Sequence, residues 1–310
     1  MSNHSCCPAE NSGAALLSAA KIAVTRRERQ ILLAMLRALL GISALAALSL
    51  ASDDPSSATY NFLTMADWGA DDAGQYATAA GMGDVAAAID AKFVFALGDN
   101  FYTRGIQMPD DGEAGHLRFN KTFESVYTAP SLRDIPFYAV AGNHDHFGNV
   151  TAQIEYTNHP QNAGGRWQFP YWYYNVTRRF EVGGKEVELE VLLFDSVVML
   201  GNTDVLQPDG SFKELKLSQL PPQGQDTPLA QEQLAWLKGR MENSTADYLW
   251  VGGHYPVWAI GQDPPTGVNG ILRGLLNEHE AQYFNGHEHD FEHLREEGTK
   301  VNYICTGAGK

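Results

Sequence analysis

The sequence predicts a layered α/β sandwich, in which mixed β-sheets are flanked by helices. Two observations lead to this fold class. Apolar stretches alternate with helical ones, and each apolar stretch ends in glycine and polar residues. Strands that alternate with helices along a chain are typical of sheets covered by helices. The strand-like stretches are "YNFLTMADWG" (60–69), "KFVFALGDN" (92–100), "PFYAVAGNHD" (136–145), "DYLWVGGHYP" (247–256) and "AQYFNGHEHD" (281–290).

Two helices are expected between these strands. The Ala-rich stretch 74–90 favours the first. The second is expected within 226–243, where Asp226 or Thr227 can cap the first turn and Pro228 suits its first position.

The middle of the chain predicts a β-hairpin followed by a loop. Residues 171–182 and 185–197 have the composition of strands, and "GGK" between them favours a tight turn. Residues 201–228 are rich in Pro, Gly, Gln and Asp. We expect them to form a long surface loop that could cover an active site.

Composition and charge exclude one class of partner. The chain has 310 residues, 44% of them hydrophobic, which is enough for a sizeable buried core. Its formal net charge is −15, whereas proteins that bind nucleic acid present a basic face. We therefore expect no nucleic-acid partner. A local cationic site made by metal ions stays compatible with this charge.

The first 51 residues predict a leader. Residues 35–51 contain one Arg, an apolar stretch and small residues before Ala51, as in a cleavable signal peptide. Residues 1–34 predict a disordered extension, and residues 52–310 a single domain. The alternative is an uncleaved anchor, but Arg37 interrupts the apolar run and the rest is short for a membrane span. We expect no stable membrane span in the mature form.

Cysteines and sequons also bear on the cellular route. Cys305 is the only cysteine beyond the leader, which excludes an intramolecular disulfide in the mature chain. Four glycosylation sequons follow the leader, among them those at Asn149 and Asn175. We expect a monomeric glycoprotein of the secretory pathway, secreted or delivered to a lysosome or vacuole.

The strand-like stretches end in side chains that can bind metal. In open α/β sheets, functional groups gather past the carboxyl ends of the strands. Taken singly, an Asp after a strand is usually a turn or cap residue, and a lone His is usually a hydrogen-bonded polar residue. Seven such residues follow the strand-like stretches, and their joint occurrence predicts a metal site. They are Asp67, Asp99, Tyr102, Asn143, His254, His287 and His289.

The same stretches resemble the signature blocks of the purple acid phosphatases, which are metallophosphoesterases. The likeness is greatest to the small, single-domain, tartrate-resistant acid phosphatase type, and it covers most of residues 60–309. It implies an αββα metallophosphoesterase sandwich that binds two metal ions. The blocks are "DWG" (67–69), "GDNFY" (98–102), "GNHD" (142–145), "GGHYP" (252–256) and "GHEH" (286–289).

The resemblance also implies which residues bind each ion. Asp67, Tyr102 and His289 would bind the first ion, and Asn143, His254 and His287 the second, while Asp99 would bridge both. Carboxylate and phenolate oxygens favour Fe(III) in the first site. An amide oxygen and two imidazoles suit Fe(II), Zn or Mn in the second.

The implied activity is that of an acid phosphatase. Its substrates would be phosphate monoesters, of small molecules or phosphoproteins, attacked by a metal-bound hydroxide. Two alternatives stay open at this point. One is a non-catalytic protein that binds iron or phosphate, and the other is a phosphodiesterase of the metallophosphoesterase group.

Further residues near these motifs receive roles. His144 is expected to contact the substrate and act as the catalytic acid, unless it only positions Asn143. Asp145 is expected to orient a ligand, and His146 to be an ordinary surface residue. Small members of the family carry another His where this chain has Asp263, which could donate a proton or repel phosphate. The family continues for several tens of residues beyond the stretch that corresponds to "TGAG" (306–309). We therefore expect the C-terminal end of this chain to be truncated.

Overall fold

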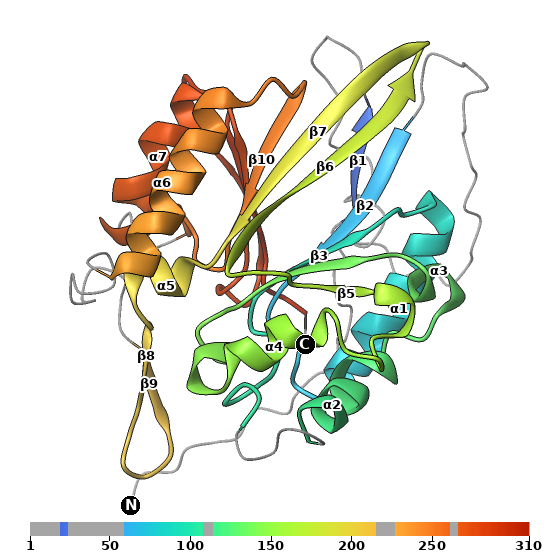
Figure 1. Cartoon of the computed structure of the whole chain (residues 1–310), viewed down its shortest axis with the longest axis vertical. Helices are drawn as coiled ribbons and strands as arrows, with labels where there is room; N and C mark the ends of the chain where they lie inside the picture. The colour runs from blue at the N-terminus through green and yellow to red at the C-terminus, as the bar shows by residue number, and fades with distance from the viewer. Residues whose placement is uncertain (1–18, 24–58, 108–113, 215–226, 261–265, 310) are drawn as a thin grey trace, which may run out of the picture.

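The computed structural model describes residues 19–23, 59–107, 114–214, 227–260 and 266–309. These residues form two β-sheets packed face to face, with helices on both outer faces (Figure 1). The predicted signal peptide at 35–51 lies outside the described residues. So does Asp263.

The first sheet has five strands in the order β1–β2–β3–β4–β5. Strands β2 to β5 are parallel, and β1 pairs antiparallel with β2 at one edge. At this edge the short segment "AAKIA" (19–23) pairs with β2. The division into 1–34, 35–51 and 52–310 stays a prediction. The bounds are β1 Ala19–Ala23, β2 Thr59–Met65, β3 Val94–Leu97, β4 Phe137–Val140 and β5 Trp167–Gln168.

The second sheet has six strands in the order β12–β13–β11–β10–β7–β6. Its four central strands are parallel, and the edge strands β12 and β6 are antiparallel to their neighbours. The bounds are β6 Tyr173–Val182, β7 Lys185–Phe194, β10 Tyr248–Gly252, β11 Gln282–Asn285, β12 Phe291–Arg295 and β13 Asn302–Thr306.

Helices cover the outer face of each sheet. Helices α1 Ala73–Ile89, α2 Ala114–Phe119, α3 Pro130–Arg133 and α4 Val150–Tyr156 lie on the first sheet. Helices α5 Ser196–Leu200, α6 Pro228–Asn243 and α7 Thr266–Glu278 lie on the second. Both predicted helices are confirmed. In α6 the Thr227 side chain caps the first turn by accepting a hydrogen bond from the Ala230 N–H.

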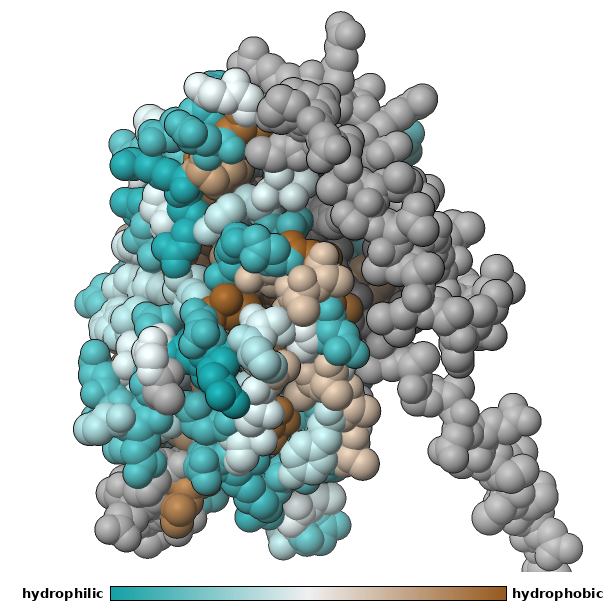
Figure 2. All heavy atoms as spheres, turned by 90° about the vertical axis from the view of Figure 1, so that its right-hand side faces the viewer, coloured by the Kyte–Doolittle hydropathy of each residue, from teal (hydrophilic) through white to brown (hydrophobic). Residues whose placement is uncertain are grey.

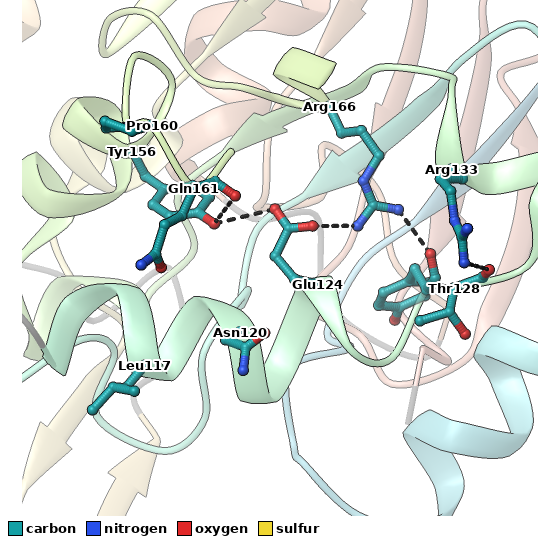
Figure 3. A pocket seen from close by; sticks show the side chains of 10 residues that line it. Leu117, Asn120, Glu124, Thr128, Arg133, Tyr156, Pro160, Gln161 and Arg166 are labelled. Carbon is teal, nitrogen blue, oxygen red and sulfur yellow. Dashed lines mark hydrogen bonds and ion pairs between the residues drawn. The ribbon is translucent and has the colours of Figure 1, made fainter. Parts of the chain in front are cut away.

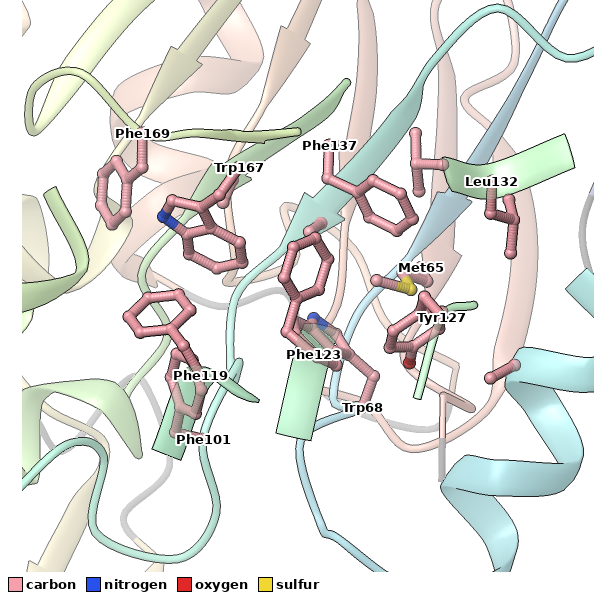
Figure 4. Close-up of a cluster of buried hydrophobic side chains, with 14 of the residues drawn as sticks. Met65, Trp68, Phe101, Phe119, Phe123, Tyr127, Leu132, Phe137, Trp167 and Phe169 are labelled. Atoms are coloured by element: carbon pink, nitrogen blue, oxygen red, sulfur yellow. The ribbon is translucent and has the colours of Figure 1, made fainter. Parts of the chain in front are cut away.

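Three layers of buried apolar side chains hold the sandwich together. Successive residues of a strand face opposite sides of a sheet, so each strand contributes to two layers. On β3, Val94 and Ala96 pack with the helices of the first sheet, in a layer rich in aromatic rings (Figure 4). Phe95 and Leu97 pack instead against the second sheet. A third layer joins the second sheet to α5, α6 and α7. The predicted fold class, an αββα sandwich, is confirmed.

The central hairpin is also confirmed. Strands β6 and β7 pair over ten residues each. Gly183 and Gly184 connect them with φ values of 58° and 76°. Both residues of this two-residue turn need positive φ, which glycine adopts without strain.

The segment 201–214, part of the loop predicted at 201–228, contains two short strands that the prediction missed. Strands β8 Asp204–Leu206 and β9 Phe212–Glu214 form a small antiparallel hairpin there. Its turn is held by Asp209, whose side chain accepts a hydrogen bond from the Ser211 N–H, and by Gly210 at φ 85°. Strands of three residues are too short to show an alternating pattern in the sequence.

The surface is that of an ordinary folded domain. On the face shown in Figure 2 the described residues are mainly hydrophilic, and the apolar ones lie in small groups. Among the described helices, none is long and apolar enough to cross a membrane.

Candidate metal centre

Five of the seven residues predicted to bind metal follow parallel strands at nearly constant spacing. Asp67 and Asp99 stand two positions after the last residues of β2 and β3, and Asn143 three after that of β4. His254 and His287 each stand two positions after β10 and β11. Parallel strands end at the same edge of a sheet, so the topology carries these side chains from both sheets to one place.

The backbone bends sharply where the ligands leave the strands. Asp67, Asp99 and His287 have φ values of 57°, 51° and 75°. Residues other than glycine are strained in this region, and such strain is typical of functional sites. Position 142 also requires glycine, because a Cβ added there would lie only 2.2 Å from Asp99 Oδ1.

Two groups of three side chains result. In the first, Tyr102 Oη lies 2.9 Å from Asp67 Oδ1 and 3.0 Å from His289 Nε2. His289 Nε2 and Asp67 Oδ1 are 3.4 Å apart. These three donor atoms therefore surround a common point.

In the second group, Asn143 Oδ1 lies 2.8 Å from His254 Nε2 and 3.1 Å from His287 Nδ1. Asp99 stands between the groups, with Oδ1 3.5 Å from His254 Nε2. Donor atoms of Asp67, Asp99 and His254 all lie within 4.8 Å of one another. The geometry thus separates the seven residues into two triads and one linking carboxylate.

The orientation of His254 suits a metal ligand. Its Nδ1 lies 2.9 Å from the carbonyl oxygen of Leu97, which can only accept a hydrogen bond. Nδ1 therefore carries a proton, and Nε2, which faces Asn143 and Asp99, is the nitrogen that would bind a metal ion. Ligand histidines commonly use their second nitrogen in this way.

Burial and charge make the site a place for cations. Asp67 and Asp99 are almost fully buried. Burial and the nearby Asp67 carboxylate raise the pKa of Asp99. Burial and the two carboxylates also raise the pKa of Tyr102 far above its usual range. Burial and the neighbouring His254 lower the pKa of His287 to about 3, so its imidazole is neutral. Closely packed carboxylate, phenol and amide oxygens beside the neutral His287 imidazole fit bound metal ions, which would also favour the phenolate form of Tyr102.

His144 lies beside the centre with both ring nitrogens engaged. Its Nδ1 lies 2.7 Å from the Thr103 carbonyl oxygen, and its Nε2 lies 3.1 Å from Asp204 Oδ2. Nε2 is also 3.9 Å from Asp99 Oδ2. Burial lowers the pKa of His144, but the Asp204 hydrogen bond and the Asp99 charge outweigh it and raise the pKa to about 9.

Comparison with known proteins decides the family. The sequence profile of the calcineurin-like phosphoesterases matches residues 60–291. The chain belongs to this family. It is 37% identical to tartrate-resistant acid phosphatase type 5 of Homo sapiens over 283 residues, which cover 89% of this chain and 80% of the relative. It is 28% identical to purple acid phosphatase 17 of Arabidopsis thaliana, over 82% of this chain and 69% of the relative. The resemblance stated from the motifs is confirmed.

Solved structures support the fold. A structure described as GAP50, the anchor in the inner membrane complex of Plasmodium, matches with a TM-score of 0.64 and 21% identity, over 80% of this chain and 71% of that one. A dimetal phosphatase from Danio rerio matches with a TM-score of 0.52 and 16% identity, over 79% of this chain and 86% of that one.

In this phosphoesterase, Asp145 holds the ligand loops together. Its carboxylate accepts hydrogen bonds from the backbone N–H groups of Asn100, Phe101 and Gly142, at 3.0, 3.1 and 2.9 Å. Gln153 Nε2 donates a fourth, at 2.9 Å. The loops that carry Asp99 and Asn143 are thus tied to one carboxylate.

The structure corrects the reading of His146 as a surface residue. Its Nε2 lies 2.8 Å from Oδ2 of Asp195, which is fully buried, and the His146 side chain is only 19% exposed. Asp195 follows β7 and lies 49 positions away, so no local pattern could pair the two residues.

Asp204 lies at the site in the segment that we expected could cover an active site, although no motif singled out this residue. Asp204 Oδ2 accepts a hydrogen bond from Asn143 Nδ2 at 2.8 Å in addition to its contact with His144. Asn202 Nδ2 donates to the Asn143 carbonyl oxygen at 2.8 Å. Both residues belong to the hairpin segment that we predicted as a loop.

The two named sequons differ in their surroundings. Asn149 caps α4, because its side chain accepts a hydrogen bond from the Ala152 N–H, and it is half-buried. Asn175 lies exposed on the edge strand β6. Glycosylation at both stays a prediction.

A cavity of about 700 Å³ is lined by residues other than the predicted ligands (Figure 3). Three of its polar side chains are engaged with one another. Arg166 Nη2 lies 2.7 Å from Glu124 Oε2, and Tyr156 Oη donates to Glu124 Oε1 at 3.1 Å. None of the residues predicted to bind metal or substrate lines this cavity.

Proposed function

We propose that the protein is an acid phosphatase that hydrolyses phosphate monoesters at a dinuclear metal centre. The observation that carries this proposal is the pair of side-chain triads joined by Asp99. The names of the relatives, tartrate-resistant and purple acid phosphatases, support it.

The ligand types assign different ions to the two positions. Asp67, Tyr102 and His289 with Asp99 would hold Fe(III), because three of these four groups bind through hard anionic oxygen. The second position would hold Fe(II), Zn or Mn, because Asn143, His254 and His287 offer an amide oxygen and neutral imidazoles. When bound, the ions would activate a water and stabilise the charge that develops on the phosphoryl group.

His144 is the proposed proton donor to the leaving oxygen. Its raised pKa keeps it protonated at acid pH. Nε2 holds its proton toward Asp204 and lies close to Asp99. On substrate binding, the Nε2–H would turn to the ester oxygen, and the O–P bond would break as the proton passes to that oxygen.

Localisation and assembly are proposed on the sequence alone. We propose a signal peptide at 35–51, passage through the secretory pathway with glycans at Asn149 and Asn175, and a monomeric enzyme.

One experiment tests the function. The purified protein is analysed for metals, its visible spectrum is recorded, and hydrolysis of an aryl phosphate is followed from pH 4 to 9. We expect about two metal ions per chain, a tyrosinate–Fe(III) absorption band and maximal turnover at acid pH. A coloured protein without turnover would instead indicate a binding protein. A colourless enzyme that prefers diesters at neutral pH would indicate a phosphodiesterase.

A further inference from the structure

Among the described residues, Arg118 is the one cationic side chain that contacts two loops carrying ligands of the first metal position. These are the loop after β2, which carries Asp67, and the loop after β3, which carries Tyr102. Arg118 stands near the end of α2, outside every motif that predicts the site. We propose that Arg118 is a positioning residue that holds Tyr102 in place to bind the first metal. The inference rests on the proposed function, because it assumes that Tyr102 is a ligand.

The contacts are direct. Arg118 Nη2 donates a hydrogen bond to the Tyr102 carbonyl oxygen at 2.6 Å and lies 3.3 Å from the Gly69 carbonyl oxygen. Gly69 follows the ligand Asp67 by two positions. One guanidinium nitrogen therefore joins the loop after β2 to the loop after β3.

The two loops already lie in close contact at this point. The Tyr102 N–H donates to the Gly69 carbonyl oxygen at 2.9 Å. A Cβ added to Gly69 would lie only 1.7 Å from the Asn100 carbonyl oxygen. Because the backbones touch, a shift of the Tyr102 peptide would be transmitted to the Asp67 loop as well.

Arg118 completes a row of backbone contacts along the loop after β3. Asp145 accepts the N–H groups of Asn100 and Phe101. Arg118 then binds the carbonyl of the next residue, Tyr102, and its guanidinium lies 5.8 Å from the centre of the Phe101 ring. An anion and a cation thus fix successive peptide groups, which limits movement of the backbone that carries the Tyr102 side chain.

The chemistry of arginine suits this role. The guanidinium keeps its charge at every pH at which the protein folds, and its planar donors can serve two carbonyl oxygens at once. The carboxylates that act on its charge are those of Asp71 and Asp145. A lysine would keep the charge, but its ammonium is not held in the plane of a guanidinium and would not point at both carbonyl oxygens with the same geometry.

Three variants test the proposal. Arg118→Met removes the charge and the hydrogen bonds but keeps an unbranched apolar side chain, and Arg118→Lys keeps the charge. Arg133→Met is the matched control, because Arg133 is exposed and donates to one carbonyl oxygen, that of Thr128. For each metal-loaded protein we would measure the tyrosinate–Fe(III) band, the rate of iron loss to a chelator, and kcat and KM for an aryl phosphate.

In Arg118→Met we expect the band to shift and weaken, and iron loss to accelerate by about tenfold or more, which is the scale seen when a partner that orients a metal ligand is removed. We expect kcat to fall while KM changes little. Arg118→Lys should lie between this variant and the wild type, and Arg133→Met should match the wild type.

A band and an iron-loss rate like those of the wild type in Arg118→Met would overturn the inference. If Arg118→Met does not fold, the absorption band and the rate of iron loss are measured in Arg118→Lys and Arg118→Gln, and these two measurements test the inference instead. Failure of the proposed function looks different. In that case the wild-type protein itself would hold no iron and show no band.

Discussion

The buried pair of His146 and Asp195 makes a prediction about stability that depends on pH. Burial lowers the pKa of His146, but the charge and hydrogen bond of Asp195 outweigh it, so the pKa is raised above its ordinary value. A group whose pKa is raised by folding stabilises the folded state below its unfolded pKa, about 6.5 for His, and this contribution disappears as pH rises through the folded pKa. The pair should therefore stabilise the enzyme most at acid pH.

The structure sets the size of the effect. The perturbation is His146→Asn, which leaves the fully buried Asp195 carboxylate without its partner at 2.8 Å. Removing one member of a buried ion pair costs about 3 to 5 kcal/mol. Asp195 Oδ1 keeps two backbone hydrogen bonds, from Val197 and Val198, so we expect a value near the lower limit, about 3 kcal/mol. In a domain of this size that corresponds to a fall in Tm of about 6 to 12 °C.

The assay is thermal and urea unfolding of the metal-loaded protein at pH 5 and at pH 9. The loss of stability in His146→Asn should be near its full value at pH 5 and clearly smaller at pH 9. His293→Asn is the control, since His293 is an exposed residue on β12 that contacts Asn302. Equal losses at the two pH values, or no loss at pH 5, would refute the assignment of a charged His146.

Three other predictions concern the metal centre. Asp99→Ala should remove both metals and lower kcat by at least about 10³-fold, because Asp99 links the two triads, and metal analysis with steady-state kinetics checks this. Asp204→Asn should lower the pKa of His144, because the Asp204 carboxylate helps to raise that pKa to about 9. The alkaline limb of a pH–kcat profile should therefore move to lower pH. Gly142→Ala should lower kcat by about 10²-fold while the protein still folds by circular dichroism, because the added Cβ would displace the Asp99 carboxylate.

The strands and their terminal ligands could be predicted from the sequence for a local reason. Five of the seven predicted ligands follow a strand by two or three residues, so an apolar run and the polar residues after it occur in one stretch. The rule that parallel strands end at one edge then brings the stretches together without any knowledge of side-chain contacts. Asp67, Asp99 and His254 could therefore be grouped before the structure was known.

The supporting residues could not be found in this way. Arg118 acts through the carbonyl oxygens of Tyr102 and Gly69. Because these are backbone atoms, the residue types at 69 and 102 do not indicate which donor contacts them. His146 depends on Asp195, which a different sheet supplies. These roles follow from how loops pack on one another, and no periodic pattern in the sequence encodes that packing.

Asp204 shows how one such residue completes the motif "GNHD". A carboxylate only accepts hydrogen bonds, so the amide nitrogen of Asn143 must face Asp204, and its oxygen then faces His254 and His287, where a cation would bind. The same oxygen of Asp204 lies beside Nε2 of His144, whose Nδ1 faces the carbonyl of Thr103. With an acceptor at each nitrogen, the ring carries two protons and a positive charge. A single carboxylate from the β8–β9 hairpin segment thus sets both the orientation of a metal ligand and the charge of the proposed proton donor.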